Sequence, residues 1–101
     1  MSFERTMQED VRRRLLLLLG ALPMFTGNEV ALRSLLAERY GHALSADRLR
    51  AELAWLDEQG LITAQQPGGV WLATLSGRGE DVARGLASMP GVARPRPGEV
   101  A

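Results

Sequence analysis

Cysteine is absent from the sequence, which excludes disulfide bonds and thiolate metal sites. Long apolar runs are also absent, because the longest, Leu15–Leu19, is far too short to cross a membrane. The arginines before this run are not followed by the longer apolar region and small-residue cleavage site of a signal peptide. We therefore expect a cytoplasmic protein that does not insert into membranes.

Residue patterns typical of enzymes are missing as well. The single histidine, His42, has no cysteine and no evident triad or metal partners, so we expect it to be a surface or capping residue. No phosphate-binding G-x-x-x-x-G-K-[ST] motif occurs. The acidic pairs Asp57/Glu58 and Glu80/Asp81 are adjacent on expected helices and therefore diverge. These absences predict a protein that is not an enzyme and has no cofactor, metal or small-molecule substrate.

Lysine is also absent, since all 12 basic side chains are arginines, and they are balanced by 12 acidic ones. A neutral balance argues against nucleic-acid binding through bulk electrostatics. Arginine nevertheless suits bidentate contacts with phosphate or guanine. The same usage, with abundant Ala, Gly and Leu, is also typical of GC-rich genomes. Composition alone leaves the partner open.

The strongest local pattern begins at Ser45, a favoured N-cap residue. At about 100° per residue, Leu49, Leu53 and Leu56 fall on one narrow arc of the helix that follows. Gly60 supplies the residue that most readily takes the left-handed conformation after a helix end. The pattern predicts an amphipathic helix between Ser45 and Gly60.

A β-hairpin is expected directly after this helix. β-Branched and aromatic residues in Leu61–Thr63 and Val70–Thr74 flank the turn sequence Gln66–Gly69, which contains Pro-Gly-Gly. Ser76 can then cap a further helix that we expect to reach Ser88. A helix, a hairpin and a helix in this order are typical of a wing and its flanking elements.

The preceding helix is marked by Thr26–Glu29, which fits a capping box. Leu32, Leu36 and Tyr40 continue its apolar side, and a short turn leads into the Ser45 helix. Residues 23–25 could add a short strand beside the hairpin. Together the patterns predict an α+β fold that is mainly α: a winged helix-turn-helix with a three-helix core, a β-hairpin wing and a C-terminal helix.

The first helix, expected over Phe3–Leu19, carries five consecutive leucines that cannot all face one core stripe. A surplus apolar surface usually marks an interface, and a second copy of the chain is the simplest partner. The alternative is that all five leucines are buried because this helix is central to the fold. The predicted homodimer interface comprises Val11, Leu15, Leu16, Leu17, Leu19 and Leu86.

Two regions are expected, a winged-helix domain over residues 1–88 and a Pro/Gly/Arg-rich C-terminal arm over residues 89–101. Prolines and glycines in the arm oppose helix formation and favour an extended or disordered segment. Its Arg94 and Arg96 suit a DNA minor groove, and the arm could also wrap across a partner subunit. A free terminus is the third possibility.

Double-stranded DNA is one expected partner, because arginine and glutamine suit base edges and a helix N-terminus suits phosphate. Against this, the Ser45 helix has four acids and two arginines, and the wing tip has no basic residue. The alternative is a protein interaction or assembly module with Trp55 and Trp71 as anchors. The predicted DNA contacts are Arg33, Arg39, Ser45, Arg48, Arg50, Gln59, Gln65 and Gln66.

Two segments, LSADRLRAELAWLDEQGLITAQQPGGVWLATLSGRGEDVARG and MPGVARPRPG, together resemble a family of small winged-helix proteins of Mu-like prophages. Members of this family are described as similar to ArsR-type transcriptional regulators. The resemblance implies a dimeric DNA-binding regulator and supplies no catalytic residues. With no cysteine and one histidine, this chain departs from the metal sensors of the ArsR type. The implied function is therefore transcription regulation without metal sensing.

Overall fold

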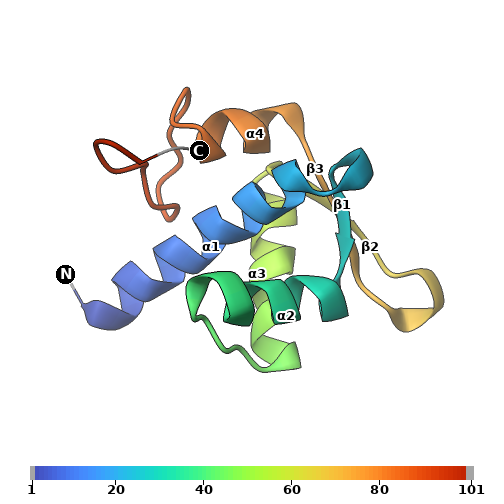
Figure 1. Cartoon of the computed structure of the whole chain (residues 1–101). Coiled ribbons are helices and arrows are strands. Elements are labelled where there is room, and N and C mark those ends of the chain that lie inside the picture. Colours follow the sequence, from blue (N-terminus) through green and yellow to red (C-terminus); the bar gives the residue numbers. More distant parts are fainter. Residues whose placement is uncertain (1, 100–101) are drawn as a thin grey trace.

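Four helices and a three-stranded antiparallel sheet make up the fold in the computed structural model, which describes residues 2–99 (Figure 1). Met1, Val100 and Ala101, the ends of the two predicted regions, lie outside the described residues. The predicted α+β class, mainly helical, is confirmed. The elements are α1 (Phe3–Ala21), η1 (Pro23–Phe25), β1 (Thr26–Asn28), α2 (Glu29–Tyr40), α3 (Ala46–Glu58), β2 (Ile62–Gln65), η2 (Pro67–Gly69), β3 (Leu72–Leu75) and α4 (Gly77–Ala83).

The hairpin of β2 and β3 is the predicted wing. Its strands pair antiparallel with Thr63 opposite Thr74, and the turn η2 places Gly68 and Gly69 at positive φ. The third strand, β1, pairs with the other edge of β3, so the sheet order is β1-β3-β2. The wing is thereby attached to the chain segment that leads into α2.

The short strand expected at residues 23–25 lies three residues later, because η1 occupies Pro23–Phe25 and the strand is Thr26–Asn28. This shift also makes the predicted capping box wrong. Asn28 is the N-cap of α2 and accepts a hydrogen bond from the backbone N–H of Ala31 at 2.8 Å. The Thr26 hydroxyl instead lies 3.0 Å from that of Thr74 across the sheet. Strand pairing therefore displaced the local capping pattern.

Helix α1 runs through the centre of the molecule, in contact with α2, α4, β1 and β3. Leu15, Leu16, Leu18 and Leu19 are all buried, with at most 1% of their surface exposed. The alternative of a buried leucine run is therefore correct for four of the five leucines, and the expected surplus apolar surface at Leu16 and Leu19 is wrong. Of the predicted dimer residues, Val11 is buried too, Leu17 is half-buried and Leu86 is exposed.

Helix α4 ends earlier than the sequence suggested. It stops at Ala83, and Gly85 follows with φ of 81°. The backbone N–H of Leu86 turns back to the carbonyl of Asp81 at 2.9 Å, which closes the helix. The prediction of a helix to Ser88 is wrong because the left-handed Gly85 terminates it.

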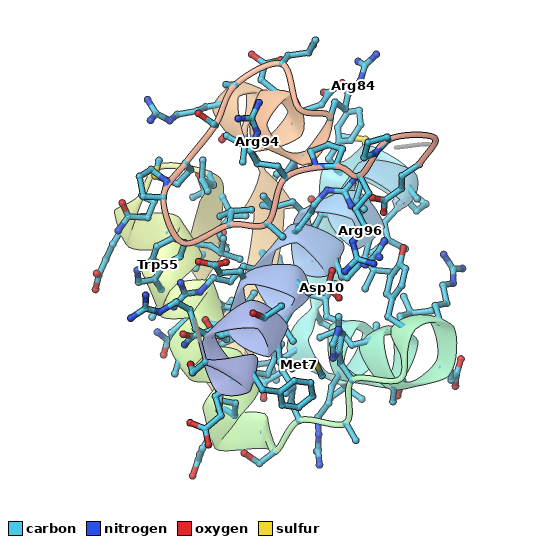
Figure 2. All side chains as sticks on the ribbon, turned by 90° about the vertical axis from the view of Figure 1, so that its left-hand side faces the viewer. Met7, Asp10, Trp55, Arg84, Arg94 and Arg96 are labelled. Carbon is cyan, nitrogen blue, oxygen red and sulfur yellow. The ribbon has the colours of Figure 1, made fainter. Side chains whose placement is uncertain are left out.

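The C-terminal segment is not a free arm over its described part. It folds back along α1, with Val92 buried, and it crosses the face on which Trp55 lies (Figure 2). The backbone N–H of Ala93 donates to the carbonyl of Glu9 at 3.1 Å. Gly91 lies so close to Trp55 that a Cβ atom there would be 2.9 Å from the indole ring. Residues 89–99 are therefore packed against the winged-helix domain.

Glu99 fastens the end of this segment. One carboxylate oxygen, Oε2, accepts hydrogen bonds from Arg13 at 2.7 Å and Arg14 at 3.0 Å. The other oxygen accepts the backbone N–H of Arg96 at 2.9 Å. The Arg96 N–H and then the Arg13 guanidinium lower the pKa of Glu99 from 4.5 to about 2. The buried guanidinium of Arg13 thus receives its counter-charge from the tail.

Within the described part of the chain, every helix is too short or too polar to cross a bilayer.

Substituting Gly79→Ala should reduce the free energy of unfolding by about 1–3 kcal/mol, measured by urea denaturation. The reason is close packing of α4, since a Cβ at Gly79 would overlap the backbone carbonyl oxygen of Leu61. Gly77→Ala, two residues earlier in α4, meets nothing within 4 Å and serves as the matched control. Equal effects of the two substitutions would contradict this packing.

Glu99→Gln should make the free energy of unfolding depend less on pH in the acidic range. Because the folded-state pKa of Glu99 is lowered, its contribution is fully present above pH 4.5 and is lost as the pH falls toward about 2. Thermal unfolding at pH 6 and pH 3 should therefore show a smaller stability difference for Glu99→Gln than for the parent protein. Glu58→Gln, at an exposed position of α3, should retain the parent difference.

Candidate nucleic-acid interface

The helix-turn-helix consists of α2, a turn and α3. Gly41 ends α2 in the left-handed conformation at φ of 72°. Ser45 caps α3, since its side chain accepts the backbone N–H of Arg48 at 3.0 Å. These are the local signals that the sequence carried, and the predicted α3 with its buried Leu49 and Leu53 is confirmed.

Three predicted DNA contacts come together at the N-terminal turn of α3. Arg33 on α2 reaches across the turn and donates from Nε to the carbonyl of Leu44 at 2.7 Å. Ser45 is exposed beside it, and Arg48 lies one turn into α3 with half of its side chain exposed. The structure therefore forms a small polar patch, which we call the α3 entry patch, from Arg33, Ser45 and Arg48.

The other predicted contacts lie elsewhere. Arg39 is exposed but lies about 120° around α2 from Arg33, on another face of that helix. Gln59 is half-buried at the C-terminal end of α3, and Gln65 and Gln66 are exposed at the wing. The eight predicted residues do not form one continuous surface.

Arg50 is engaged by Glu29, which is buried at the start of α2. Glu29 Oε1 accepts from Arg50 Nε at 3.0 Å and from Nη2 at 2.6 Å. Its Oε2 accepts the backbone N–H of Trp71 at 2.7 Å. Hydrogen bonds from Arg50 and then from Trp71 lower the pKa of Glu29. This Glu29 clamp joins α2, α3 and the base of the wing, so Arg50 positions these elements.

A second hydrogen-bond network lies between α3 and α1, away from the Glu29 clamp. The buried carboxylate of Glu52 binds Arg12 at 2.8 Å, Gln8 at 3.0 Å and Arg48 at 3.3 Å. The Arg12 guanidinium also stacks 3.8 Å from the centre of the Trp55 ring. Glu52 is therefore an internal charge and does not belong to the outer face of α3.

Sequence reasoning missed both carboxylates. A signal for Glu52 was present, because at 100° per residue it lies about 40° from Leu56, at the border of the apolar arc. Glu29 was predicted as a capping-box residue, and no local signal indicated its actual partners, which are 21 and 42 residues away. Trp55 and Trp71, the anchors expected of an interaction module, are half-buried and pack against the core.

His42 is also placed differently from expectation. It is 7% exposed and its Nε2 lies 2.7 Å from a carboxylate oxygen of Asp10 on α1. The expected surface position is wrong, because the turn after α2 folds against α1. Among residues 2–99, His, Asp and Glu side chains form no cluster of three suited to a metal ion.

The electrostatic character of the surface varies along α3. Asp47, Asp57 and Glu58 are exposed, and Asp57 accepts the backbone N–H of Ala64 at 3.3 Å. The wing tip carries no charged side chain. The two arginines of α3, Arg48 and Arg50, therefore both lie in its N-terminal half, near the α3 entry patch.

Glu29→Gln should loosen the wing. Loss of the carboxylate charge weakens the bonds from Arg50 and from the Trp71 N–H, so the Trp71 amide should exchange with solvent faster. Hydrogen-deuterium exchange measures this, with the buried centre of α1 as an internal reference. Glu38→Gln, at an exposed position of the same helix, should leave Trp71 exchange unchanged. Unaltered exchange in Glu29→Gln would show that the clamp does not restrain the wing.

The described residues share their fold with solved structures of two complexes. The complex of hsRosR-S1 matches with a TM-score of 0.65 and 21% sequence identity, over 79% of this chain and 70% of that chain. The complex of hsRosR-S4 matches with a TM-score of 0.61 and 20% identity, over 79% and 76% of the two chains. These likenesses support the winged-helix architecture.

The sequence is similar to a bacteriophage protein. No protein-family model matches the chain. An uncharacterized protein of Haemophilus influenzae (strain KW20 Rd) is 36% identical over 66 residues, which cover 65% of this chain and 63% of that protein. The uncharacterized protein gp26 of Escherichia phage Mu is 46% identical over 70 residues, which cover 69% of this chain and 72% of gp26. The chain therefore belongs to the family of phage Mu gp26.

Proposed function

We propose that this protein is a dimeric winged-helix transcription regulator of ArsR-like type that binds double-stranded DNA, senses no metal and catalyses no reaction. The observation that carries the proposal is the α3 entry patch. Arg33 from α2, and Ser45 and Arg48 from the start of α3, lie around the exposed N-terminal turn of the helix that enters DNA in this architecture.

In this proposal the patch residues have different roles. Arg33 and Arg48 present guanidinium groups suited to phosphate or to a base edge. The first backbone N–H groups of α3 suit a phosphate, although the hydrogen bond of Ser45 to Arg48 already satisfies one of them. Gln65 and Gln66 at the wing add uncharged hydrogen-bonding groups. Arg50 contributes indirectly, because the Glu29 clamp fixes α3 relative to the wing.

A second candidate function is a protein interaction module that does not bind DNA. It is favoured by the exposed acids Asp47, Asp57 and Glu58 on α3, which repel phosphate. The exposed Val30, 68% accessible beside a cavity of about 300 Å³ between α2 and α3, favours it as well. The acids would suit a basic protein surface and Val30 an apolar one, and neither feature suits a polyanion.

Selection of DNA fragments at low salt, followed by mobility-shift titration, tests the two functions. The parent protein should bind DNA with an affinity that falls steeply with salt. The double variant Arg33→Ala/Arg48→Ala should weaken binding by roughly tenfold or more and reduce the salt slope by about 2. Its fold should persist, because Glu52 keeps its bonds to Arg12 and Gln8.

The matched control is Arg39→Ala/Arg78→Ala, which removes the same charge from exposed positions outside the patch. It should change affinity much less than the patch variant. Equal losses would indicate non-specific charge attraction. Absence of any DNA complex at low salt would refute the proposal in favour of the interaction module.

A further inference from the structure

A hollow lies between the C-terminal end of α1 and α4, far from the α3 entry patch in the chain. Its volume is about 260 Å³. Its floor includes the buried Leu16 and Ala83, and exposed Gly20 and Ala21 form part of its rim. The small side chains leave space that this chain does not fill. The surface is therefore suited to receive an apolar side chain from outside.

The same surface carries projecting apolar side chains. Phe25, which is 49% exposed, forms one wall of the hollow, and its neighbour Met24 is 84% exposed. Both have positive φ, 57° at Met24 and 56° at Phe25, a conformation that large side chains rarely adopt. The turn is held by hydrogen bonds from the Phe25 N–H to Leu22 and from the Thr26 hydroxyl to Met24. Large apolar groups are thus fixed beside a hollow lined by small ones.

Charge on this surface is self-complementary. Glu80 and Arg84 line the hollow on α4, and their side chains are 44% and 56% exposed. They form an ion pair at 3.2 Å within one chain. Arg84 lies at the upper edge of the molecule (Figure 2). Two copies related by a two-fold axis between these residues would bring each Glu80 opposite the other Arg84.

We propose that this surface is the homodimer interface, occupied by the same surface of a second copy. Met24 and Phe25 of each copy pack at the hollow of the other, and Glu80 and Arg84 pair across the two-fold axis. The inference rests on the dimer of the proposed function. The leucines of α1 that the sequence predicted for the interface are mostly buried, and the surface proposed here is accessible to a second copy. The projecting apolar side chains, the hollow that receives them and both charged residues lie on one surface, as a two-fold contact between identical chains requires.

Charge exchange across the axis gives a specific test by sedimentation velocity. Glu80→Arg alone places two arginine pairs at the interface, and Arg84→Glu alone places two glutamate pairs there. Each variant should dimerise at least tenfold more weakly than the parent. An equimolar mixture restores two Glu–Arg contacts in the heterodimer and should dimerise like the parent. A mixture that associates no better than either variant would overturn the proposal.

Met24→Asn provides a second variant that should fold, because asparagine tolerates the left-handed conformation. It should weaken dimerisation, whereas Phe3→Asn, at an exposed apolar position near the other end of α1, should not. The reverse result would place the interface at the start of α1 and overturn the inference. A parent dimer that binds DNA and is unaffected by the Glu80, Arg84 and Met24 variants would refute this interface alone. A dimer that these variants weaken but that binds no DNA would refute DNA binding and leave the interface standing.

Discussion

The fold depends on compensating the buried carboxylate of Glu52. A charge with 2% exposure is tolerated only when cations and hydrogen-bond donors surround it, and α1 supplies both through Arg12 and Gln8. Arg12 in turn covers Trp55 and donates to the carbonyl of Gly91 at 3.1 Å. One guanidinium therefore connects α1, α3 and the C-terminal segment. The position of α3 relative to α1 follows from this requirement.

Half of the arginines of this protein are paired with carboxylates of the same chain. Six of the 12 arginines form ion pairs with carboxylates of the described residues, and Arg33 is bonded to a backbone carbonyl. The all-arginine composition therefore reflects internal bidentate and stacking contacts as much as surface recognition. The paired arginines are Arg12, Arg13, Arg14, Arg48, Arg50 and Arg84.

The sequence predicted the elements whose signals are local. The Ser45 cap and the Pro-Gly-Gly turn act within a few residues, so α3 and the wing were correct. The α3 entry patch was partly recognised, because its residues flank these signals. Contacts between distant segments were not predictable. Glu99 binds Arg13, which is 86 positions away in the sequence, and Thr26 lies in strand β1, where its hydroxyl bonds with that of Thr74, 48 positions away. In these cases tertiary pairing overrode the local pattern.

Burial of Glu52 changes the electrostatic argument about DNA. The acid that lies closest to the middle of α3 is internal and balanced by Arg12, so it does not face a ligand. The remaining exposed acids lie toward the helix ends, with Asp57 and Glu58 at the C-terminal end. Arg33 and Arg48 lie near the N-terminal end, where α3 also has the positive end of its dipole. Asp47 is the one exposed acid in the first turn of α3, where Arg33, Arg48 and the helix dipole oppose its charge, whereas Asp57 and Glu58 have no nearby arginine of α3. A polyanion approaching α3 would therefore be held more favourably at the N-terminal end than at the C-terminal end.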